Sequence, residues 1–221
     1  MNETFLLTNI LPQDFKNNGG YWNMMEIFVR QLTNKVPNVY VLSGPLFRKT
    51  KTENGQAFVN YQVIGAGGVA VPSHLFKVVL VEAGSRILLD AFVVPNQRIP
   101  LPTPLSHFRV PLDELEKELG MDLYPGLARD RYSSLCESNI GCELMPVRDF
   151  LRIIYERKFR GARTLHWLER QWSKAQRDDM HLDPVTKELY EAKRAELEAK
   201  GQRKEEHKGI TLPSSPAATP A

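Results

Sequence analysis

The sequence contains no apolar run long enough to cross a membrane. Its hydrophobic stretches fall well short of the roughly 18–20 residues that a membrane-spanning helix needs. The N-terminus, from Met1 to Leu7, carries one acid and no base, so it resembles neither a secretory signal nor an Arg-rich transit peptide. We therefore expect no targeting segment in this sequence.

Cysteine is scarce as well. The two cysteines, Cys136 and Cys142, are close enough in sequence to close a small loop as a disulfide. Two reduced thiols are the more frequent outcome for such a pair, and we favour that state. No second cysteine pair or flanking histidine cluster supports a structural zinc site.

The net charge is small but unevenly distributed. The whole chain has a formal charge of +3, whereas the segment Arg152–Arg177 holds eight basic and two acidic residues. This surplus favours a polyanionic partner such as DNA or RNA, although a solvated helix face explains the charge equally well. Aromatic residues interleave the segment, and of these we expect Trp172 in the core; they are Tyr155, Phe159, Trp167 and Trp172. The candidates for contact with nucleic acid are Arg152, Arg157, Lys158, Arg160 and Arg163.

Hydrophobic residues make up 42% of the chain and charged residues 25%, which is ordinary for a globular protein. Apolar runs rich in Val, Ile and Leu, separated by short turns, predict a mostly antiparallel sheet. These predicted strands span 39–43, 58–64, 69–71, 76–81 and 87–94. A helix is predicted over 21–35, and a short helix is expected to begin at Asp113, with Glu116 completing a capping box.

After residue 146 the pattern becomes helical. We expect three helices, over 149–160, 163–180 and 184–200, with Asp183 capping the third and Gly201 ending it. The predicted fold class is therefore α+β, with a sheet domain over 1–145, a helical extension over 146–200 and a disordered tail over 201–221.

One group of polar residues is a candidate functional site. Asn18, Trp22, Glu26 and Arg30 follow one another at intervals of four residues, and Asn9 ends the strand just before them. An amide oxygen, a carboxylate and a guanidinium on one helix stripe could bind a phosphate and Mg²⁺, which takes few protein oxygens. Spacing alone favours a simpler interpretation, in which Asn18 caps the helix, Glu26 pairs with Arg30 and Trp22 lies in the core.

Five ordered segments of the chain resemble motifs of the DNA/RNA non-specific nucleases. Residues 3–13 are similar to the family pattern ETFxLSNxxPQ, and residues 18–30 to NxxxWxxxExxxR. Three further segments, 39–46, 71–78 and 91–96, resemble the patterns VxVx[ST]GPL, VP[ST]HxxK and AFVxPN. The helical end, around Gly161-Ala162-Arg163, is similar in a looser way to the extension of mitochondrial members of the family.

The resemblance implies a ββα-metal nuclease that hydrolyses DNA and RNA with Mg²⁺ or Mn²⁺ and no small-molecule cofactor. Asn18 would be the metal ligand, Glu26 would orient a water of the metal, Arg30 would steady the scissile phosphate, and Asn9 would hold hydrogen bonds of the site. It also implies a homodimer and a mitochondrial location.

One family motif has no counterpart in this sequence. The general base of the family is a histidine in an (Asp/Ser)-Arg-Gly-His motif upstream of the ETF strand, whereas here Met1 stands three residues before Thr4 and Arg160-Gly161 is followed by Ala162. His74 matches a family position that we interpret as structural. We therefore expect an N-terminally incomplete sheet and a loss of activity of at least about 10²–10⁴-fold. Two alternatives are a catalytically dead form that binds nucleic acid or dimerises with a full-length subunit, and a helical interaction module over 146–200.

Overall fold

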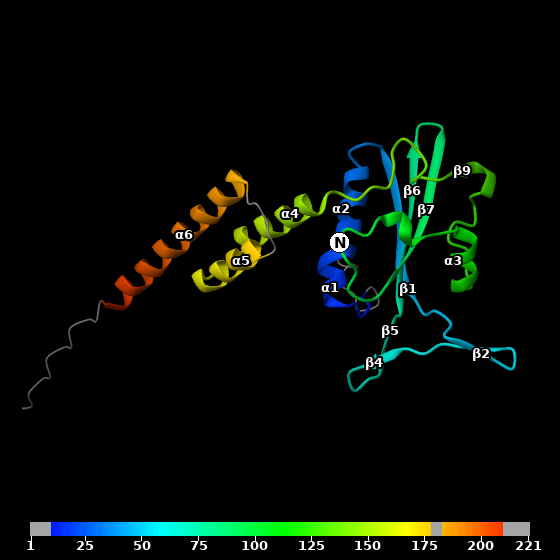
Figure 1. Ribbon diagram of the computed structural model, residues 1–221, viewed down its shortest axis with the longest axis horizontal. Coiled ribbons are helices and arrows are strands. Elements are labelled where there is room, and N and C mark those ends of the chain that lie inside the picture. Colours follow the sequence, from blue (N-terminus) through cyan, green and yellow to red (C-terminus); the bar gives the residue numbers. More distant parts are fainter. Residues whose placement is uncertain (1–9, 178–182, 210–221) are drawn as a thin grey trace, which may run out of the picture. The chain divides into compact units, whose positions relative to one another are not determined.

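The computed structural model describes residues 10–177 and 183–209, with side chains described as far as residue 201 (Figure 1). The chain divides into two compact units, Met1–Met145 and Pro146–Ala221. No helix of the described residues is long and apolar enough to span a bilayer.

The first unit is built on a mostly antiparallel sheet, as predicted. The neighbouring strands in order are β1 (Asn38–Leu46), β6 (His74–Ala83), β7 (Arg86–Pro95) and β8 (Arg109–Val110). A short strand, β9 (Tyr132–Ser133), pairs with β7 in parallel. The long central strands β6 and β7 are joined by a tight turn, which fixes their register over ten residue pairs.

Alternation along β6 sends side chains to the two faces of this sheet. Leu75, Val79 and Val81 pack into one core cluster with the N-terminal helical segment, whereas Phe76, Val78 and Leu80 pack into a second cluster with α3. The segment on the first face consists of α1 (Phe15–Asn17), η3 (Asn18–Trp22) and α2 (Asn23–Leu32), and α3 (Leu112–Leu119) covers the second face. Each face of the sheet therefore has its own hydrophobic core.

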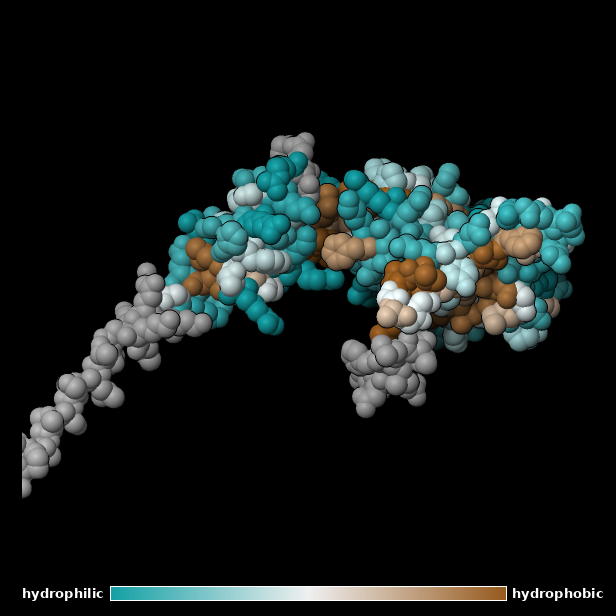
Figure 2. Space-filling model, turned by 90° about the horizontal axis from the view of Figure 1, so that it is seen from below, coloured by the Kyte–Doolittle hydropathy of each residue, from teal (hydrophilic) through white to brown (hydrophobic). Residues whose placement is uncertain are grey.

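Two short ribbons lie outside these cores. They are formed by β2 (Lys51–Glu53) with β3 (Gln56–Phe58), and by β4 (Gln62–Ile64) with β5 (Val69–Val71). Figure 2, viewed from the side on which the ribbons project in Figure 1, shows apolar surface among polar residues. The ribbon region contributes the exposed side chains of Phe58, Val59, Tyr61, Val63, Ile64 and Val69, which are 38–55% exposed.

The capping box expected at α3 is wrong. Pro111 precedes the helix as its N-cap, and Asp113 lies within the first turn. The carboxylate of Glu116 is buried, accepts a hydrogen bond from the backbone N–H of Leu123 at 2.9 Å and pairs with Arg129. Glu116 thus faces the chain that follows the helix instead of the residue that precedes it. The 3₁₀ turns η4 (Leu105–Phe108) and η5 (Arg129–Arg131) flank this helix in the sequence.

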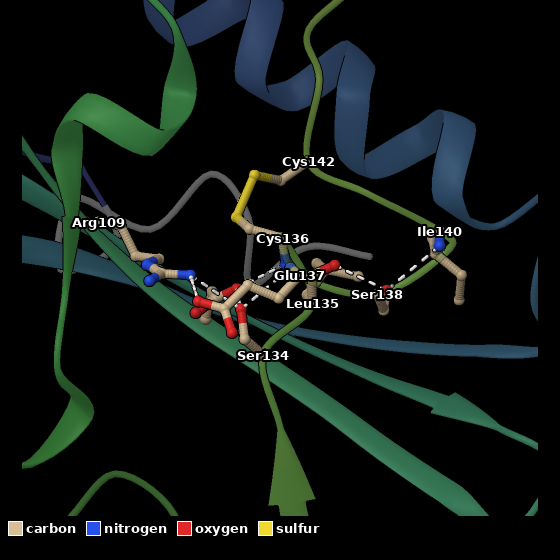
Figure 3. Close-up of a disulfide and its surroundings, with 9 residues drawn as sticks. Arg109, Ser134, Leu135, Cys136, Glu137, Ser138, Ile140 and Cys142 are labelled. Atoms are coloured by element: carbon tan, nitrogen blue, oxygen red, sulfur yellow. Dashed lines mark hydrogen bonds and ion pairs between the residues drawn. A yellow bond between two sulfur atoms is a disulfide. The ribbon is translucent and has the colours of Figure 1, made fainter.

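The two cysteines form a disulfide, contrary to the reduced state that we favoured (Figure 3). The backbone N–H of Cys136 and the hydroxyl of Ser134 both donate to Asp90 Oδ2 at 2.8 Å, which ties the loop to β7. Cys142 belongs to the same core cluster as Trp22 and Met25. The loop is therefore held both at the sheet and at the helix α2.

The second unit contains three helices, α4 (Val147–Arg160), α5 (Leu165–Arg177) and α6 (Pro184–Gly209). They share a core of aromatic and small side chains, in which Trp172 stacks on Tyr190 at a ring distance of 4.0 Å. Asp183 caps α6 as expected, since its Oδ1 accepts from the backbone N–H of Thr186 at 2.9 Å. The expected end at Gly201 is not seen, because α6 continues to Gly209; one glycine between helix-forming residues costs only about 1 kcal/mol. The rest of the expected tail lies outside the described residues.

Candidate metal centre

The candidate metal ligand Asn18 is not the N-cap of its helical segment. Asp14 is the N-cap, and its Oδ1 accepts from the backbone N–H of Asn17 at 2.7 Å. The backbone N–H of Asn18 donates to the carbonyl of Asp14 at 2.9 Å, within the helical segment. The side chain of Asn18 is exposed. Its amide is therefore not used for capping.

Asn18 begins a π-helical turn that the sequence did not predict. This turn runs from Asn18 to Trp22 and contains Gly20, whose φ of −113° and ψ of −105° are not helical. Regular α-helix starts only at Asn23. Such single π-turns within helices occur frequently at functional sites. The turn changes the angular relation between Asn18 and the residues that follow Trp22.

The four residues of the stripe divide into one buried and three exposed side chains. Trp22 is 8% exposed and belongs to the core cluster under α2, which confirms the simpler interpretation for this residue. Asn18, Glu26 and Arg30 are all exposed. Glu26 and Arg30 form no ion pair in the part of the chain that the structure describes, and Asn9 lies outside that part.

The loop before the candidate metal helix, the helical segment 18–32 that carries Asn18, Glu26 and Arg30, is fastened to the sheet by Asn96, a residue whose role the sequence did not reveal. Asn96 Oδ1 accepts from the backbone N–H of Asp14 at 2.8 Å. Asn96 Nδ2 donates to the carbonyls of Pro12 at 3.1 Å and Pro72 at 2.9 Å. One half-buried amide thus ties the loop of Pro12 and Asp14, immediately before Asn18, to the backbone at Pro72.

Two further contacts hold the π-turn at its ends. Asn17 is fully buried and donates from Nδ2 to the carbonyl of Pro95 at 3.0 Å. Tyr21 is also fully buried, and its hydroxyl donates to the carbonyl of Thr103 at 2.9 Å. Burial raises the pKa of the Tyr21 phenol, so that it stays a donor. These bonds fix the exposed Asn18 between two anchored neighbours.

Lys77 lies beneath the same helix. It is on β6, opposite Ser43 of β1, and is 5% exposed. Its Nζ donates to Ser43 Oγ at 2.9 Å and lies 4.4 Å from the centre of the Trp22 ring. Burial lowers the pKa of Lys77, and the negative charge of Glu26 acts in the opposite direction. The sequence analysis did not identify Lys77, although a lysine within the apolar run 75–81 was a signal that could have done so.

The described part of the first unit contains two histidines, His74 and His107. His74 is half-buried, with Nδ1 3.0 Å from Ser73 Oγ. Burial lowers the pKa of His74, and Arg48 lowers it further. His107 is exposed beside Phe108, with ring centres 5.1 Å apart. Neither residue belongs to the stripe of the metal helix.

In the second unit, the candidate nucleic-acid residues are mainly exposed, but the aromatic residues are mainly not. Tyr155 and Phe159 are buried, Trp172 is stacked in the core, and Trp167 is 38% exposed. Nζ of Lys158 lies 4.9 Å from the ring centre of Tyr155, and Arg152 is 3.9 Å from Asp149. Of the candidate residues, Arg157, Arg160 and Arg163 are exposed and form no ion pair with a described residue.

The donor atoms of the stripe suit a hard cation. They are an exposed amide oxygen at Asn18 and an exposed carboxylate at Glu26. Within the described ranges, no three His, Cys, Asp or Glu residues come together as a metal-binding group. A site with few protein oxygens fits Mg²⁺ or Mn²⁺, which are bound largely through oxygen, better than zinc, which prefers nitrogen and sulfur ligands.

Comparison with known proteins agrees with the motifs. Residues 1–130 match the model of the DNA/RNA non-specific endonuclease family. The chain is 44% identical over 214 residues to "Nuclease EXOG, mitochondrial" of Xenopus laevis, which covers 95% of this chain and 60% of the relative. It is 41% identical over 207 residues to the human protein of the same name, covering 91% of this chain and 56% of the relative.

A solved structure is similar as well. It is the crystal structure of an EndoG/EndoGI complex, with a TM-score of 0.57 and 37% identity over 63% of this chain and 58% of the other. The present chain thus spans about 60% of the length of the proteins it matches. The matched residues have an α+β fold, as predicted, and this chain also has a helical C-terminal region. The chain belongs to the DNA/RNA non-specific endonuclease family.

Proposed function

We propose that the exposed stripe on the metal helix serves the Mg²⁺- or Mn²⁺-dependent hydrolysis of phosphodiester bonds in DNA and RNA. The observation that carries this proposal is the separation of the stripe into a buried Trp22 and three exposed polar residues, Asn18, Glu26 and Arg30. A helix that only covered the sheet would not need its exposed Asn18 anchored on both sides.

Each residue of the stripe has a distinct task in this proposal. Asn18 holds the cation through its amide oxygen, and Glu26 orients a water through its carboxylate. Arg30 binds a phosphate oxygen, for which a guanidinium is well shaped. Asn9 supports the site by hydrogen bonds, as the family resemblance implies. The cation, when bound, stabilises negative charge on the departing oxygen.

The second unit would extend the contact with nucleic acid. The exposed guanidinium groups of Arg157, Arg160 and Arg163 are suited to phosphates. Arg152 and Lys158 lie on α4 together with Arg157 and Arg160. Trp167, the exposed aromatic residue of α5, could stack on a base. Binding of the chain to DNA should then weaken steeply with salt, and replacement of the three arginines by glutamine should flatten that dependence by about three counter-ions. A salt-insensitive affinity would favour a solvated helix face.

The location and the oligomeric state that we propose are taken from the relatives and from the family resemblance. Several of them are named mitochondrial, and we propose a mitochondrial location for the protein to which this chain belongs. A homodimer is proposed from the family resemblance. Sedimentation of the purified chain at two concentrations tests it directly.

Cleavage by residues 1–221 alone is expected to be weak. None of the five histidines of this sequence stands in an Arg-Gly-His motif, and Mg²⁺ on a single neutral amide is a poor source of hydroxide. The specific alternative is therefore a chain that binds nucleic acid without cutting it.

The test compares plasmid degradation by residues 1–221 and by a version extended upstream to include Arg-Gly-His. We expect cleavage by the extended version only, and its loss with EDTA or with Asn18→Ala. An extended version whose Asn18→Ala variant cuts at the parent rate would contradict the assignment of the metal ligand. Strong cleavage by the short version, sensitive to EDTA and to Asn18→Ala, would show that another residue is the base.

A further inference from the structure

Lys77 interrupts a row of apolar side chains in the central strand. Three other residues of β6 on this face, Leu75, Val79 and Val81, are at most 1% exposed. Lys77 occupies the same row and is itself 5% exposed. Burying an ammonium group is unfavourable. A protein with an apolar residue of similar volume in place of a buried charge is often as stable or more stable. Packing therefore does not explain a lysine at this position.

The partners of the ammonium group do not cancel its charge. Ser43 Oγ is a neutral acceptor, and the Trp22 ring offers only its electron-rich face. Among the described residues, Lys77 forms no ion pair with a carboxylate. Glu26, one helical turn beyond Trp22, influences Lys77 through space and is itself exposed to solvent. A positive charge thus remains below the helix that carries Asn18 and Arg30.

A charge in this place acts on both ligands of the proposed site. In the low-dielectric interior its field is screened far less than the field of a surface lysine. It attracts the phosphate of a substrate and the carboxylate of Glu26, and it repels a divalent cation. Removing the charge should therefore weaken phosphate binding and strengthen cation binding. A loss of structure would instead weaken the binding of both.

We propose that Lys77 is a positioning residue whose buried charge favours the anionic substrate at the metal helix, at the expense of weaker cation binding. The proposal rests on the proposed function of the stripe. It assigns to Lys77 no contact with substrate, since its side chain is buried and its ammonium group lies against the Trp22 ring. The required feature is the charge and not the shape of the side chain.

The charge-removing variant is Lys77→Met. It should weaken binding of a phosphodiester by about five- to thirty-fold, the effect of a unit charge over roughly 8–16 Å at an effective dielectric constant of about 20. Because the Coulomb energy doubles for a divalent cation, the variant should tighten binding of Mn²⁺ by at least about thirtyfold over the same distances. Its melting temperature should equal or exceed that of the parent chain. Lys77→Arg keeps the charge and should leave both affinities within about threefold of the parent.

The experiment uses residues 1–221 at pH 7 and low salt. Mn²⁺ affinity is measured by electron paramagnetic resonance, and phosphodiester affinity by NMR with a thymidine dinucleotide that has a phosphorothioate linkage, in the absence of metal. Lys35→Met is the matched control, because it removes the same charge from an exposed position where solvent screens it. If Lys77→Met does not fold, Lys77→Gln takes its place in the same two titrations.

Opposite shifts of the two affinities in the charge-removing variant, absent in Lys35→Met, support the proposal. Shifts in the same direction, or no shift, overturn it, because a merely structural lysine would weaken both ligands together. A parent chain that binds neither probe would refute the proposed site and this inference with it. If the parent binds both probes, the proposed site stands and the variants alone decide the role of Lys77.

Discussion

Asn96 offers the most direct test of how the metal helix is held. Its side chain makes three hydrogen bonds to backbone groups, one accepted from Asp14 and two donated to Pro12 and Pro72. Each such bond contributes about 0.5–1.5 kcal/mol net, and the half-buried position allows water to restore part of what is lost. We therefore expect Asn96→Ala to lower the free energy of unfolding of the first unit by about 2–3 kcal/mol.

A nearly isosteric variant separates the donors from the acceptor. Asn96→Asp keeps an oxygen for the N–H of Asp14, but it replaces both donors by an anion that faces the two carbonyls. It should therefore destabilise the unit at pH 7 at least as much as Asn96→Ala does. Because those carbonyls disfavour the ionised form, the new carboxyl should have a raised pKa in the folded state. Stability should then recover as the pH falls below the raised value.

Trp22 provides a local probe for this measurement. It is the one tryptophan of the first unit, since Trp167 and Trp172 belong to the second. Urea unfolding followed by tryptophan fluorescence in a Trp167→Phe, Trp172→Phe background thus reports on the first unit alone. Gln97→Ala, at the exposed neighbouring position, is the control. The reasoning is refuted if both Asn96 variants unfold within about 0.5 kcal/mol of this control.

Three further predictions concern other parts of the chain. The double variant Cys136→Ser, Cys142→Ser should lose about 2 kcal/mol in urea unfolding, because the disulfide closes a loop between cysteines six positions apart; an unchanged midpoint would contradict this. His74 has a lowered pKa in the folded state, so its contribution to stability is complete above the unfolded pKa and declines as the pH falls through about 6.5 toward the folded value. In urea unfolding between pH 5 and 8, the midpoint of a His74→Gln chain should not show this decline toward low pH. A decline as large as that of the parent chain would contradict the prediction. Asp183→Ala should lower the stability of the second unit by about 1 kcal/mol in thermal unfolding, while Asp183→Asn should largely preserve it; equal losses in both would rule out a capping role.

The sheet and the helices could be predicted because they depend on local patterns. Runs of Val, Ile and Leu with short turns identified β6 and β7, and Asp183-Pro184 identified the start of α6. The spacing of four residues identified Asn18, Glu26 and Arg30 as candidates, and all three are exposed, although spacing alone favoured a simpler interpretation. The strand predicted over 58–64 is wrong, because the structure divides these residues between β3 and β4, which belong to two separate ribbons.

The supports of the site could not be predicted in the same way. The bond from Asp14 to Asn96 joins residues 82 positions apart, and hydrogen bonds to the distant carbonyls of Pro95 and Thr103 hold Asn17 and Tyr21 at the two ends of the π-turn. The burial of Lys77 likewise depends on the register of β1 against β6. Local propensity says nothing about such long-range contacts, although they decide where Asn18 is held.

The central claim, that Asn18 is the ligand of a divalent cation, is tested most directly by Mn²⁺ titration of residues 1–221 and two asparagine variants. Asn18→Ala removes the proposed ligand, and Asn34→Ala removes an exposed amide from the turn after α2. The account predicts saturable binding of one Mn²⁺ by the parent, the same binding by Asn34→Ala, and a loss of affinity of at least about tenfold in Asn18→Ala, since Mg²⁺ and Mn²⁺ sites depend on few protein oxygens. Equal affinities in all three proteins would contradict it.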